Sequence, residues 1–132
     1  MKKKIRLSWE ETIELINKLA KIIKKEKIKF ENIYGVPRGG LLPAVILSHR
    51  LDLPLVQIPG EKTLVVDDIS DRGRTLSKYK NYKIASIFNT KWTITKPNYF
   101  VAWKTSKNSW IIFPWENPDK EKENEIKKMR YL

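Results

Sequence analysis

Two short segments hold the residues whose types and spacing could do chemistry. In residues 64–76 an apolar run reaches two adjacent carboxylates, Asp67 and Asp68, and then a turn that contains Asp71 and Gly73. Ionised carboxylates only accept hydrogen bonds, so the vicinal hydroxyl groups of a sugar are natural partners for this pair. The turn is expected to open a helix, whose free N–H groups and partial positive charge would hold a phosphate. The segment therefore predicts a site for a phosphorylated sugar.

An ordinary strand-to-helix turn is the alternative for these residues, because Asp71 would then serve as a helix N-cap. Capping leaves the two preceding carboxylates unexplained, since ionised groups at the edge of a buried strand are costly unless they have partners. The ligand-binding interpretation is therefore favoured. In this interpretation Gly73 lets the backbone approach the anion, and Thr75 adds a hydroxyl donor.

The second segment, Pro37-Arg38-Gly39-Gly40, has the composition of an anion-binding loop. Paired glycines allow successive N–H groups to converge on one anion, and Arg38 supplies a fixed charge with several donors. A tight turn between a strand and a helix is the alternative. Alone the motif is weak evidence, but its place upstream of Asp67 and Asp68 strengthens it.

The elements that must position these residues alternate between strands and helices. Ser8 and Glu11 form a capping box ahead of apolar residues at helical spacing. Predicted helices cover residues 9–23, 41–51 and 72–80, and predicted strands cover residues 32–36, 54–58, 63–67 and 83–89. This alternation predicts an α/β fold with a central parallel sheet, helices on both faces and ligands at the carboxyl ends of the strands.

The composition limits the classes that are open to the chain. Its 132 residues suit a single domain, and 41% hydrophobic with 32% charged residues is typical of a soluble globular protein. No apolar run has the length of a membrane span or the pattern of a signal peptide, so a cytoplasmic location is expected. The absence of cysteine excludes disulfides and thiolate sites, and the lone His49 is expected to be a helix residue rather than a metal ligand.

The formal net charge is +12, from 27 Lys and Arg against 15 Asp and Glu. An excess of this size indicates a polyanionic partner, and nucleic acid is one candidate. The lysines are spread along helix faces and both ends of the chain rather than gathered between aromatic residues. A surface or compositional origin of the charge is therefore favoured, and nucleic-acid binding is the minority hypothesis. In either case the positive field would help to attract a polyphosphate substrate.

In this order the two segments resemble the diphosphate loop and the ribose-phosphate signature of the type I phosphoribosyltransferases, and the resemblance covers residues 8–116. It implies that phosphoribosyl diphosphate is held by residues of both segments: Arg38, Gly39, Asp67, Asp68, Asp71, Arg72, Gly73, Arg74 and Thr75. It also implies that Asp67 and Asp68 hold Mg²⁺, directly or through water, and that Asp71 lies near purine N7 and transfers a proton. In the family the peptide bond after the arginine position is often strained or cis, which singles out Arg38–Gly39.

The last third of the chain resembles the purine-specific branch of this family, the xanthine–guanine–hypoxanthine enzymes. The resemblance implies that Trp110 and Ile111 form one wall of a base pocket and that Lys91 contacts the purine 6-oxo group. Trp115 is a second candidate for stacking on the base. Core packing is the alternative for the aromatic residues here, and a dimer surface is another. The resemblance further implies a small hood over the site, formed mainly by residues 92–116. The charged residues of the segment 117–132 predict a solvated tail.

The implied reaction is transfer of ribose 5-phosphate from phosphoribosyl diphosphate to N9 of guanine, hypoxanthine or xanthine, with release of diphosphate. Two departures from the family matter. Arg72 stands where a small hydroxyl residue is usual, and only residues 59–62 remain where related enzymes have a long mobile loop. The shortened loop keeps a second function open: a non-catalytic regulator that binds phosphoribosyl diphosphate or a purine nucleotide, or an RNA-binding relative. Family members are commonly dimers or tetramers, so a homo-oligomer is expected.

Overall fold

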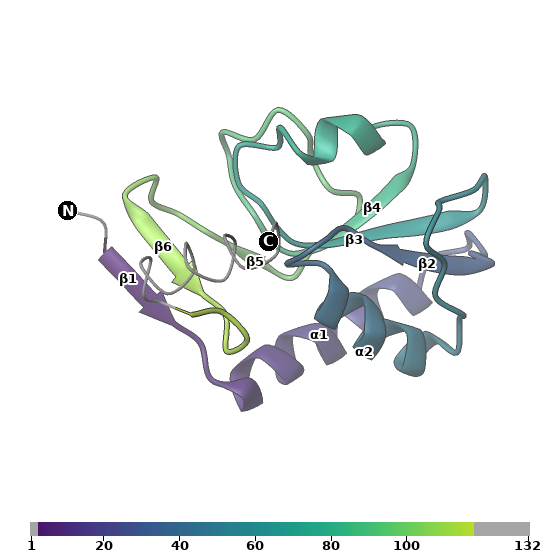
Figure 1. Ribbon diagram of the computed structural model, residues 1–132, viewed down its shortest axis with the longest axis horizontal. Helices are drawn as coiled ribbons and strands as arrows, with labels where there is room; N and C mark the ends of the chain where they lie inside the picture. The colour runs from purple at the N-terminus through teal and green to yellow at the C-terminus, as the bar shows by residue number, and fades with distance from the viewer. Residues whose placement is uncertain (1–2, 118–132) are drawn as a thin grey trace, which may run out of the picture.

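The computed structural model describes residues 3–117. Its main sheet has four parallel strands in the order β2-β3-β4-β5 (Figure 1). A separate two-stranded parallel sheet pairs β1 with β6. The strands are β1 (Lys3–Arg6), β2 (Asn32–Gly35), β3 (Thr63–Ser70), β4 (Lys83–Asn89), β5 (Ala102–Trp103) and β6 (Ser109–Ile112), and the helices are α1 (Trp9–Lys24), α2 (Leu41–Leu51) and the 3₁₀ helix η1 (Leu76–Tyr79).

The helix α1 begins at the predicted capping box. The Ser8 hydroxyl accepts a hydrogen bond from the Glu11 amide, and the Glu11 carboxylate accepts one from the Ser8 amide, both at 3.0 Å. Apolar residues at helical spacing, including Ile16, Leu19 and Ile23, are buried on one side of the helix. The α2 helix occupies its predicted bounds, and His49 is an exposed residue near its end.

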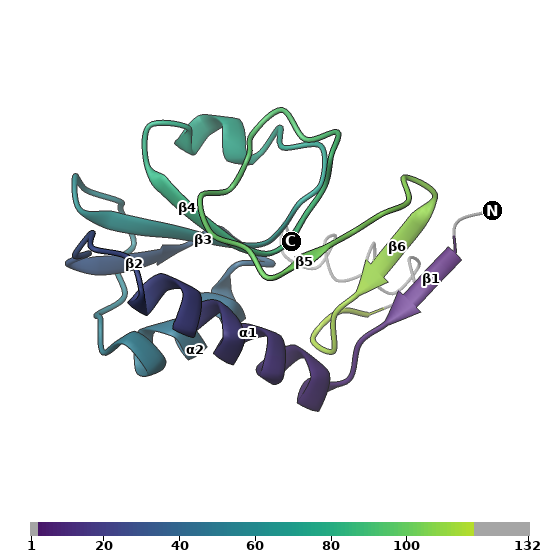
Figure 2. The ribbon, with the colours of Figure 1, turned by 180° about the vertical axis from the view of Figure 1, so that it is seen from behind.

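The predicted parallel sheet is confirmed, but the two faces are covered differently. The helices α1 and α2 lie along the same face (Figures 1 and 2), where they pack on β-strand residues such as Leu64, Val66 and Ile87. On the other face the only helix within residues 3–117 is η1, and its Leu76 packs with Val65. Partly buried tyrosines complete this smaller cluster: Tyr34, Tyr79 and Tyr82.

The predicted helix over residues 72–80 is wrong in length, because only Leu76–Tyr79 is helical. Gly73 has a φ of 80°, which lies outside the helical region. Its carbonyl accepts a hydrogen bond from the Thr95 hydroxyl at 2.7 Å, so the first half of the segment is tied to residues 90–95. Only the second half of the segment is left to form a helix, and it forms the short 3₁₀ helix η1.

The predicted strand over residues 54–58 is also wrong. Only Leu55 makes a β-bridge, to Ile33. The side chain of Ile58 is 83% exposed, so a longer strand here would bury little additional apolar surface. The turn predicted at residues 59–62 is present, since the Gly60 amide donates to the Thr63 hydroxyl at 2.7 Å. The strand β3 instead extends past its predicted end to Ser70.

The segment predicted to form a hood divides between the two sheets. Within residues 92–116, β5 joins the edge of the main sheet beside β4, and β6 pairs with β1. Of the charged tail, all but residue 117 lies outside the described residues. No helix within residues 3–117 is both long and apolar enough to cross a membrane.

Parallel pairing brings the carboxyl ends of β2, β3, β4 and β5 to one edge of the main sheet. The segments that follow these ends are residues 36–40, 71–75, 90–95 and 104–107. In Figures 1 and 2 the segments after β3 and β4 run side by side, and the Ile94 amide donates to the Arg72 carbonyl at 3.0 Å. This edge is where ligands bind in open parallel sheets.

Candidate functional site

Asp67 and Asp68 lie near the end of β3, which is flanked by β2 and β4. Asp67 is 9% exposed, and Asp68 is half-buried. Each carboxylate accepts a hydrogen bond at 2.8 Å from the backbone amide of the next residue: Asp67 from Asp68, and Asp68 from Ile69. These bonds fix the two side chains but leave most of their acceptor capacity unused.

Burial and mutual repulsion give the two carboxyl groups unusual acidity. Burial, followed by the charge of Asp68, raises the pKa of Asp67 to about 9. Burial also raises the pKa of Asp68, although hydrogen bonds from Asp67 and the Ile69 amide act in the opposite direction. The pair therefore retains a proton at neutral pH and would give it up to a cation placed between the carboxylates.

The loop over residues 36–40 lies against this pair. A Cβ at Gly39 would overlap the carboxylate of Asp68, and a Cβ at Gly40 would come within 2.9 Å of the Asp67 Cα. The cis peptide bond is Pro37–Arg38, so the expectation of Arg38–Gly39 is corrected by one residue. Both glycines lie against β3 with no room for a side chain.

The loop over residues 71–75 forms the other wall of the site. Asp67, Asp68, Asp71 and the residues 72–75 line one pocket of about 430 Å³, together with Ile69 and Leu76. Within residues 3–117, the backbone amides of the residues 72–75 have no hydrogen-bond acceptor. These free donors, not a helix N-terminus, are what the loop offers to an anion.

Asp71 makes two hydrogen bonds with its side chain. Its Oδ2 accepts from Lys104 Nζ at 2.7 Å, and its Oδ1 accepts from the indole N–H of Trp92 at 2.9 Å. The Lys104 side chain is only 6% exposed, against 41% for Asp71. Partial burial alone would raise the pKa of Asp71, but the hydrogen bonds from Lys104 and Trp92 and the charge of Lys104 together hold it below the usual 3.8. Asp71 is therefore ionised at neutral pH.

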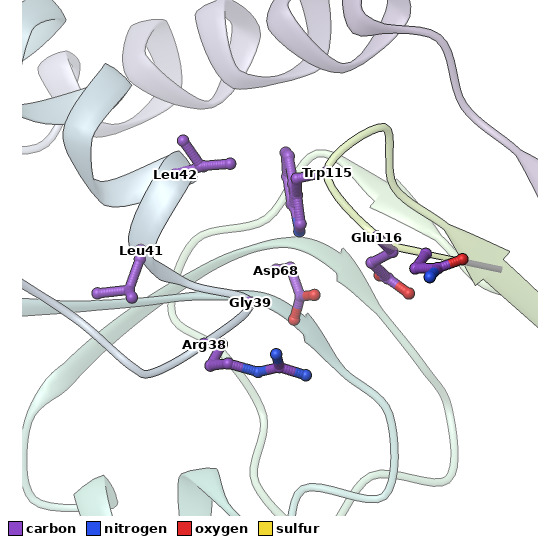
Figure 3. A pocket seen from close by; sticks show the side chains of 8 residues that line it. Arg38, Gly39, Leu41, Leu42, Asp68, Trp115 and Glu116 are labelled. Atoms are coloured by element: carbon purple, nitrogen blue, oxygen red, sulfur yellow. The ribbon is translucent and has the colours of Figure 1, made fainter. Parts of the chain in front are cut away.

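A second pocket, of about 540 Å³, opens on the other side of Asp68 (Figure 3). Arg38 and Gly39 line it from one side, and Trp115 and Glu116 from the other. Figure 3 shows the nitrogen end of the Trp115 ring directed toward Asp68. The Trp115 Nε1 is buried and has no hydrogen-bond partner among the described residues. Phe113 stacks on the same ring, with centroids 4.9 Å apart.

The structure brings together all the residues predicted to hold phosphoribosyl diphosphate, because Asp68 lines both pockets. The residues predicted to hold the purine are more dispersed. Lys91 lines another pocket, with Trp92, Trp103, Lys104 and Thr105. Trp110 and Ile111 lie on β6 and line neither of the pockets at Asp68, and Ile111 is 7% exposed in the core.

Sequence reasoning missed Lys104, Trp92 and Glu116 at this edge of the sheet. Lys104 directly follows β5, and Trp92 follows β4. A charged residue placed just after an apolar strand is the signal that could have singled out Lys104, because the carboxyl ends of parallel strands meet at one edge. Nothing in the sequence marks Glu116, whose position depends on how residues 113–117 fold back.

Within residues 3–117, no group of three or more His, Asp or Glu side chains could hold a metal ion. Asp67 and Asp68 supply two carboxylates, which are hard oxygen ligands suited to Mg²⁺. Mg²⁺ usually takes one or two carboxylates from the protein and completes its octahedron with waters and substrate phosphates. The donor set therefore fits Mg²⁺ that arrives with a phosphorylated ligand.

Comparisons with known proteins find similar phosphoribosyltransferases. The chain is similar to a purine phosphoribosyltransferase from Pyrococcus horikoshii, with 34% identity, a TM-score of 0.75, and coverage of 88% of this chain and 96% of that one. It is also similar to a xanthine-guanine phosphoribosyltransferase from Desulfotalea psychrophila, with 29% identity over 69% of this chain and 73% of that protein.

A third similarity extends to fold alone. The crystal structure of a hypothetical protein from Neisseria gonorrhoeae with bound ppGpp has a TM-score of 0.74 at 19% identity, and the match covers 98% of each chain. No family model matches the sequence.

Proposed function

Because the chain belongs to the type I phosphoribosyltransferase family, we propose that it transfers ribose 5-phosphate from phosphoribosyl diphosphate to N9 of a purine base, releasing diphosphate. Guanine, hypoxanthine and xanthine are the proposed acceptors. The observation that carries this proposal is the position of Asp68, whose carboxylate lines both the pocket of the residues 71–75 and the pocket of Arg38 and Gly39. One substrate that carries a phosphate on one side and a diphosphate on the other would fill both.

The two pockets suggest how the sugar donor lies. The free amides of the residues 72–75 would hold the 5′-phosphate, with the side chains of Arg72, Arg74 and Thr75 nearby. Asp67 and Asp68 would accept hydrogen bonds from the ribose hydroxyls. Arg38 and the Gly39 amide would face the diphosphate. Mg²⁺, when bound by Asp67 and Asp68, would neutralise charge on the leaving diphosphate.

The residues around C1′ would favour positive charge on the sugar as diphosphate leaves. In the proposed pose the carboxylates of Asp67 and Asp68 would lie beside the sugar, and the Arg38 guanidinium beside the diphosphate, which is the polarity that such a transition state needs. Asp71 is the proposed proton acceptor near purine N7. Lys104 and Trp92 each donate to one of its two oxygens, so a proton from the base would have to reach one of the remaining lone pairs.

For the base we retain the three residues that the resemblance implies, with Lys91 at the 6-oxo group and Trp110 and Ile111 as a wall. Trp115 is the aromatic residue that lines the pocket at Asp68, so it is the stacking residue that the geometry favours over Trp110.

The test is a transfer assay. The protein is mixed with phosphoribosyl diphosphate, Mg²⁺ and one of guanine, hypoxanthine or xanthine, and nucleotide and diphosphate are measured together. We expect equimolar formation of both products with at least one base. Binding of phosphoribosyl diphosphate without any product would contradict the enzyme proposal.

Asp71→Asn tests the proton-transfer role. We expect turnover to fall by about 10²–10⁴-fold, the range for loss of a general base, while nucleotide still binds. The variant leaves Lys104 buried without its carboxylate, so a thermal unfolding scan must accompany the assay. Unchanged turnover in the folded variant would remove this role from Asp71.

A second function has specific support. Residues 59–62 form a tight turn with no length to cover the site, so a bound substrate would be more exposed to water than in relatives with a long loop. The fold neighbour from Neisseria gonorrhoeae contains ppGpp, a purine nucleotide carrying extra phosphates. A non-catalytic sensor of phosphoribosyl diphosphate or purine nucleotides is therefore the second candidate, and the assay above separates it from the enzyme.

A further inference from the structure

The net charge of the chain is concentrated in one segment. Residues 72–115 contain nine Lys and Arg and no Asp or Glu, whereas residues 3–71 contain twelve Lys and Arg against ten Asp and Glu. The segment forms η1, β4, β5, β6 and the loops between them. Its η1 helix and the loop after β4 lie on the side of the main sheet opposite α1 and α2 (Figures 1 and 2). Nine of the twelve net positive charges therefore belong to the part of the fold without α-helices.

Five of these nine cations have no part in the transfer reaction proposed above. The two arginines of the loop over residues 71–75, together with Lys91 and Lys104, account for the other four. The five remaining side chains are all exposed, and they are Lys78, Lys80, Lys83, Lys96 and Lys107. Within residues 3–117, none of them has a carboxylate within 4.0 Å. Uncompensated positive charge of this kind attracts polyanions.

A pocket of about 330 Å³ at the amino end of β4 is lined by three of the five: Lys80, Lys83 and Lys96. This pocket has no residue in common with either pocket at Asp68. Its backbone is fixed, because the Asn98 side chain accepts a hydrogen bond from the Ile84 amide and the Asn98 amide donates to the Ile84 carbonyl, both at 2.8 Å. The three lysines therefore surround a rigid hollow that lies outside the proposed active site.

Two neighbouring pockets extend this hollow along the sheet. Ile94 lines it and also the next pocket, of about 360 Å³, to which Trp92 and Lys107 contribute. Trp92 in turn lines a third pocket, of about 320 Å³, together with Trp103. The row begins at the amino end of β4 and ends just past its carboxyl end. We call it the basic track and define it by Lys80, Lys83, Lys96, Trp92, Lys107 and Trp103.

The length of the basic track follows from the strand beside it. Ile84 and Asn89 are about 17 Å apart along β4, at the ~3.3 Å per residue of a parallel strand. That distance spans several nucleotides of a single strand. A small phosphorylated ligand, by contrast, would fill one of the three pockets and leave the lysines of the others uncompensated.

Aromatic side chains lie among the cations of the basic track. Trp103 is 48% exposed, and the Lys107 ammonium lies over the Trp92 ring, 5.7 Å from its centroid. Tyr82 lines the first pocket between two lysines. Every nucleobase has a π face that stacks on such rings, and lysines hold the phosphates between the bases. The fold thus gathers cations and aromatic residues that are separate in the sequence.

We propose that the basic track binds single-stranded nucleic acid, an activity that goes beyond the transfer of ribose 5-phosphate. The exposed lysines would contact successive backbone phosphates, and Trp103 would stack on a base. A duplex keeps the faces of its bases inside its own stack, so the exposed rings favour a single strand. The strand would pass along the outer side of the loop over residues 71–75, and not through the pockets at Asp68.

Fluorescence anisotropy with a labelled oligouridylate of about 12 nucleotides tests the proposal. The oligonucleotide carries no terminal phosphate and no purine, and excess ribose 5-phosphate is present, so the proposed substrate site cannot account for its binding. We expect saturable binding that weakens as the salt concentration rises and that is tighter than the binding of a duplex of equal length. The tighter ligand of oligouridylate and oligothymidylate identifies the strand as RNA or DNA.

A triple variant tests the first pocket, and it combines Lys80→Gln, Lys83→Gln and Lys96→Gln. We expect its affinity for the oligonucleotide to fall at least tenfold. The slope of the logarithm of affinity against the logarithm of salt concentration should become shallower by about 2, since each lost phosphate contact removes about 0.7.

The matched control removes the same charge from exposed positions of α1, on the other face of the sheet, and combines Lys18→Gln, Lys21→Gln and Lys24→Gln. It should bind the oligonucleotide nearly as tightly as the wild type. Equal weakening by the control and by the triple variant would show that the net charge of the molecule, and not the basic track, governs binding.

Trp103→Ala separates base stacking from attraction between charges. We expect the affinity to fall by about fivefold or more, as for loss of a stacked base, while the dependence on salt stays that of the wild type because no charge is removed. Thermal unfolding scans check that each variant is folded.

Four results would overturn the proposal: no saturable binding, tighter binding of the duplex, equal weakening by the α1 control, or full affinity in Trp103→Ala. None of these measurements needs turnover. A failed transfer assay would therefore leave the basic track standing, and failure of the basic track would leave the transferase proposal standing.

Discussion

At the scale of single residues, the site is defined by carboxyl groups that the fold makes hard to ionise. Asp67 and Asp68 are adjacent and largely buried, and both have raised pKa values because burial penalises their charged forms. Asp71 is a few residues away and has the opposite shift, because Lys104 and Trp92 donate to it. Three carboxyl groups on one strand and its loop therefore differ in acidity, which suits the two roles we propose for them: a cation-binding pair and an ionised proton acceptor.

Asp67→Asn tests the raised pKa of Asp67 through its effect on stability. The native pKa of about 9 lies above the unfolded value of 3.8, so between these values the native state holds a proton that the unfolded state has lost. This contribution to stability is complete below about pH 4 and is lost as the pH rises toward 9. The wild type should therefore lose stability over this range, and Asp67→Asn should be the more stable protein at about pH 8, by roughly 1–3 kcal/mol.

Urea denaturation of both proteins at several pH values, without ligand or Mg²⁺, measures this difference. Asp52→Asn is the control, because Asp52 is exposed and asparagine tolerates its left-handed backbone. Parallel stability curves for the wild type and Asp67→Asn would contradict the raised pKa.

At the scale of elements, the sequence predicted correctly those helices and strands that the local pattern of apolar residues determines. The capping box and helical spacing placed α1, and the apolar runs placed β2, β3 and β4 within a few residues. The errors lie where contacts distant in sequence decide the structure. Gly73 lies against Thr93 and Thr95, which removes the first half of the predicted helix, and the two-residue β5 pairs with the edge of β4. The same cause explains why Lys104 was missed, since only the pairing of β5 with β4 brings it near Asp71.

Gly39→Ala tests whether the loop after β2 and the end of β3 form one site. The added Cβ would overlap the Asp68 carboxylate, so the loop or the carboxylate must move. We expect the affinity for phosphoribosyl diphosphate to fall at least tenfold, about 1.4 kcal/mol, as measured by calorimetry.

Gly60→Ala is the matched control for this substitution. Its Cβ would have Thr63 Oγ1 as its nearest neighbour, at 3.8 Å, so binding and folding should be those of the wild type. Equal affinities for Gly39→Ala and Gly60→Ala would show that the loop and the carboxylate do not act together.

At the scale of the whole molecule, the chemistry-bearing segments come from four strands whose carboxyl ends share one edge. The α-helices cover one face of the main sheet and leave the other to η1 and its tyrosines (Figures 1 and 2). The sequence predicted the edge and the residues that follow β2 and β3 on it, because parallel strands must end together. It could not predict the division of the residues 92–116 between two sheets, which depends on β1 pairing with β6 across almost the full described length of the chain.

The central claim is that Asp67 and Asp68 bind the cation that accompanies phosphoribosyl diphosphate. The most direct test is calorimetric titration of the wild type with phosphoribosyl diphosphate and Mg²⁺ at about pH 8, repeated in two buffers of different ionisation enthalpy. The account predicts saturable one-to-one binding with release of up to about one proton, because the proton retained by Asp67 and Asp68 must leave when the cation binds. The Asp68→Asn variant should bind at least tenfold more weakly. An absence of saturable binding, or equal binding by Asp68→Asn, would contradict it.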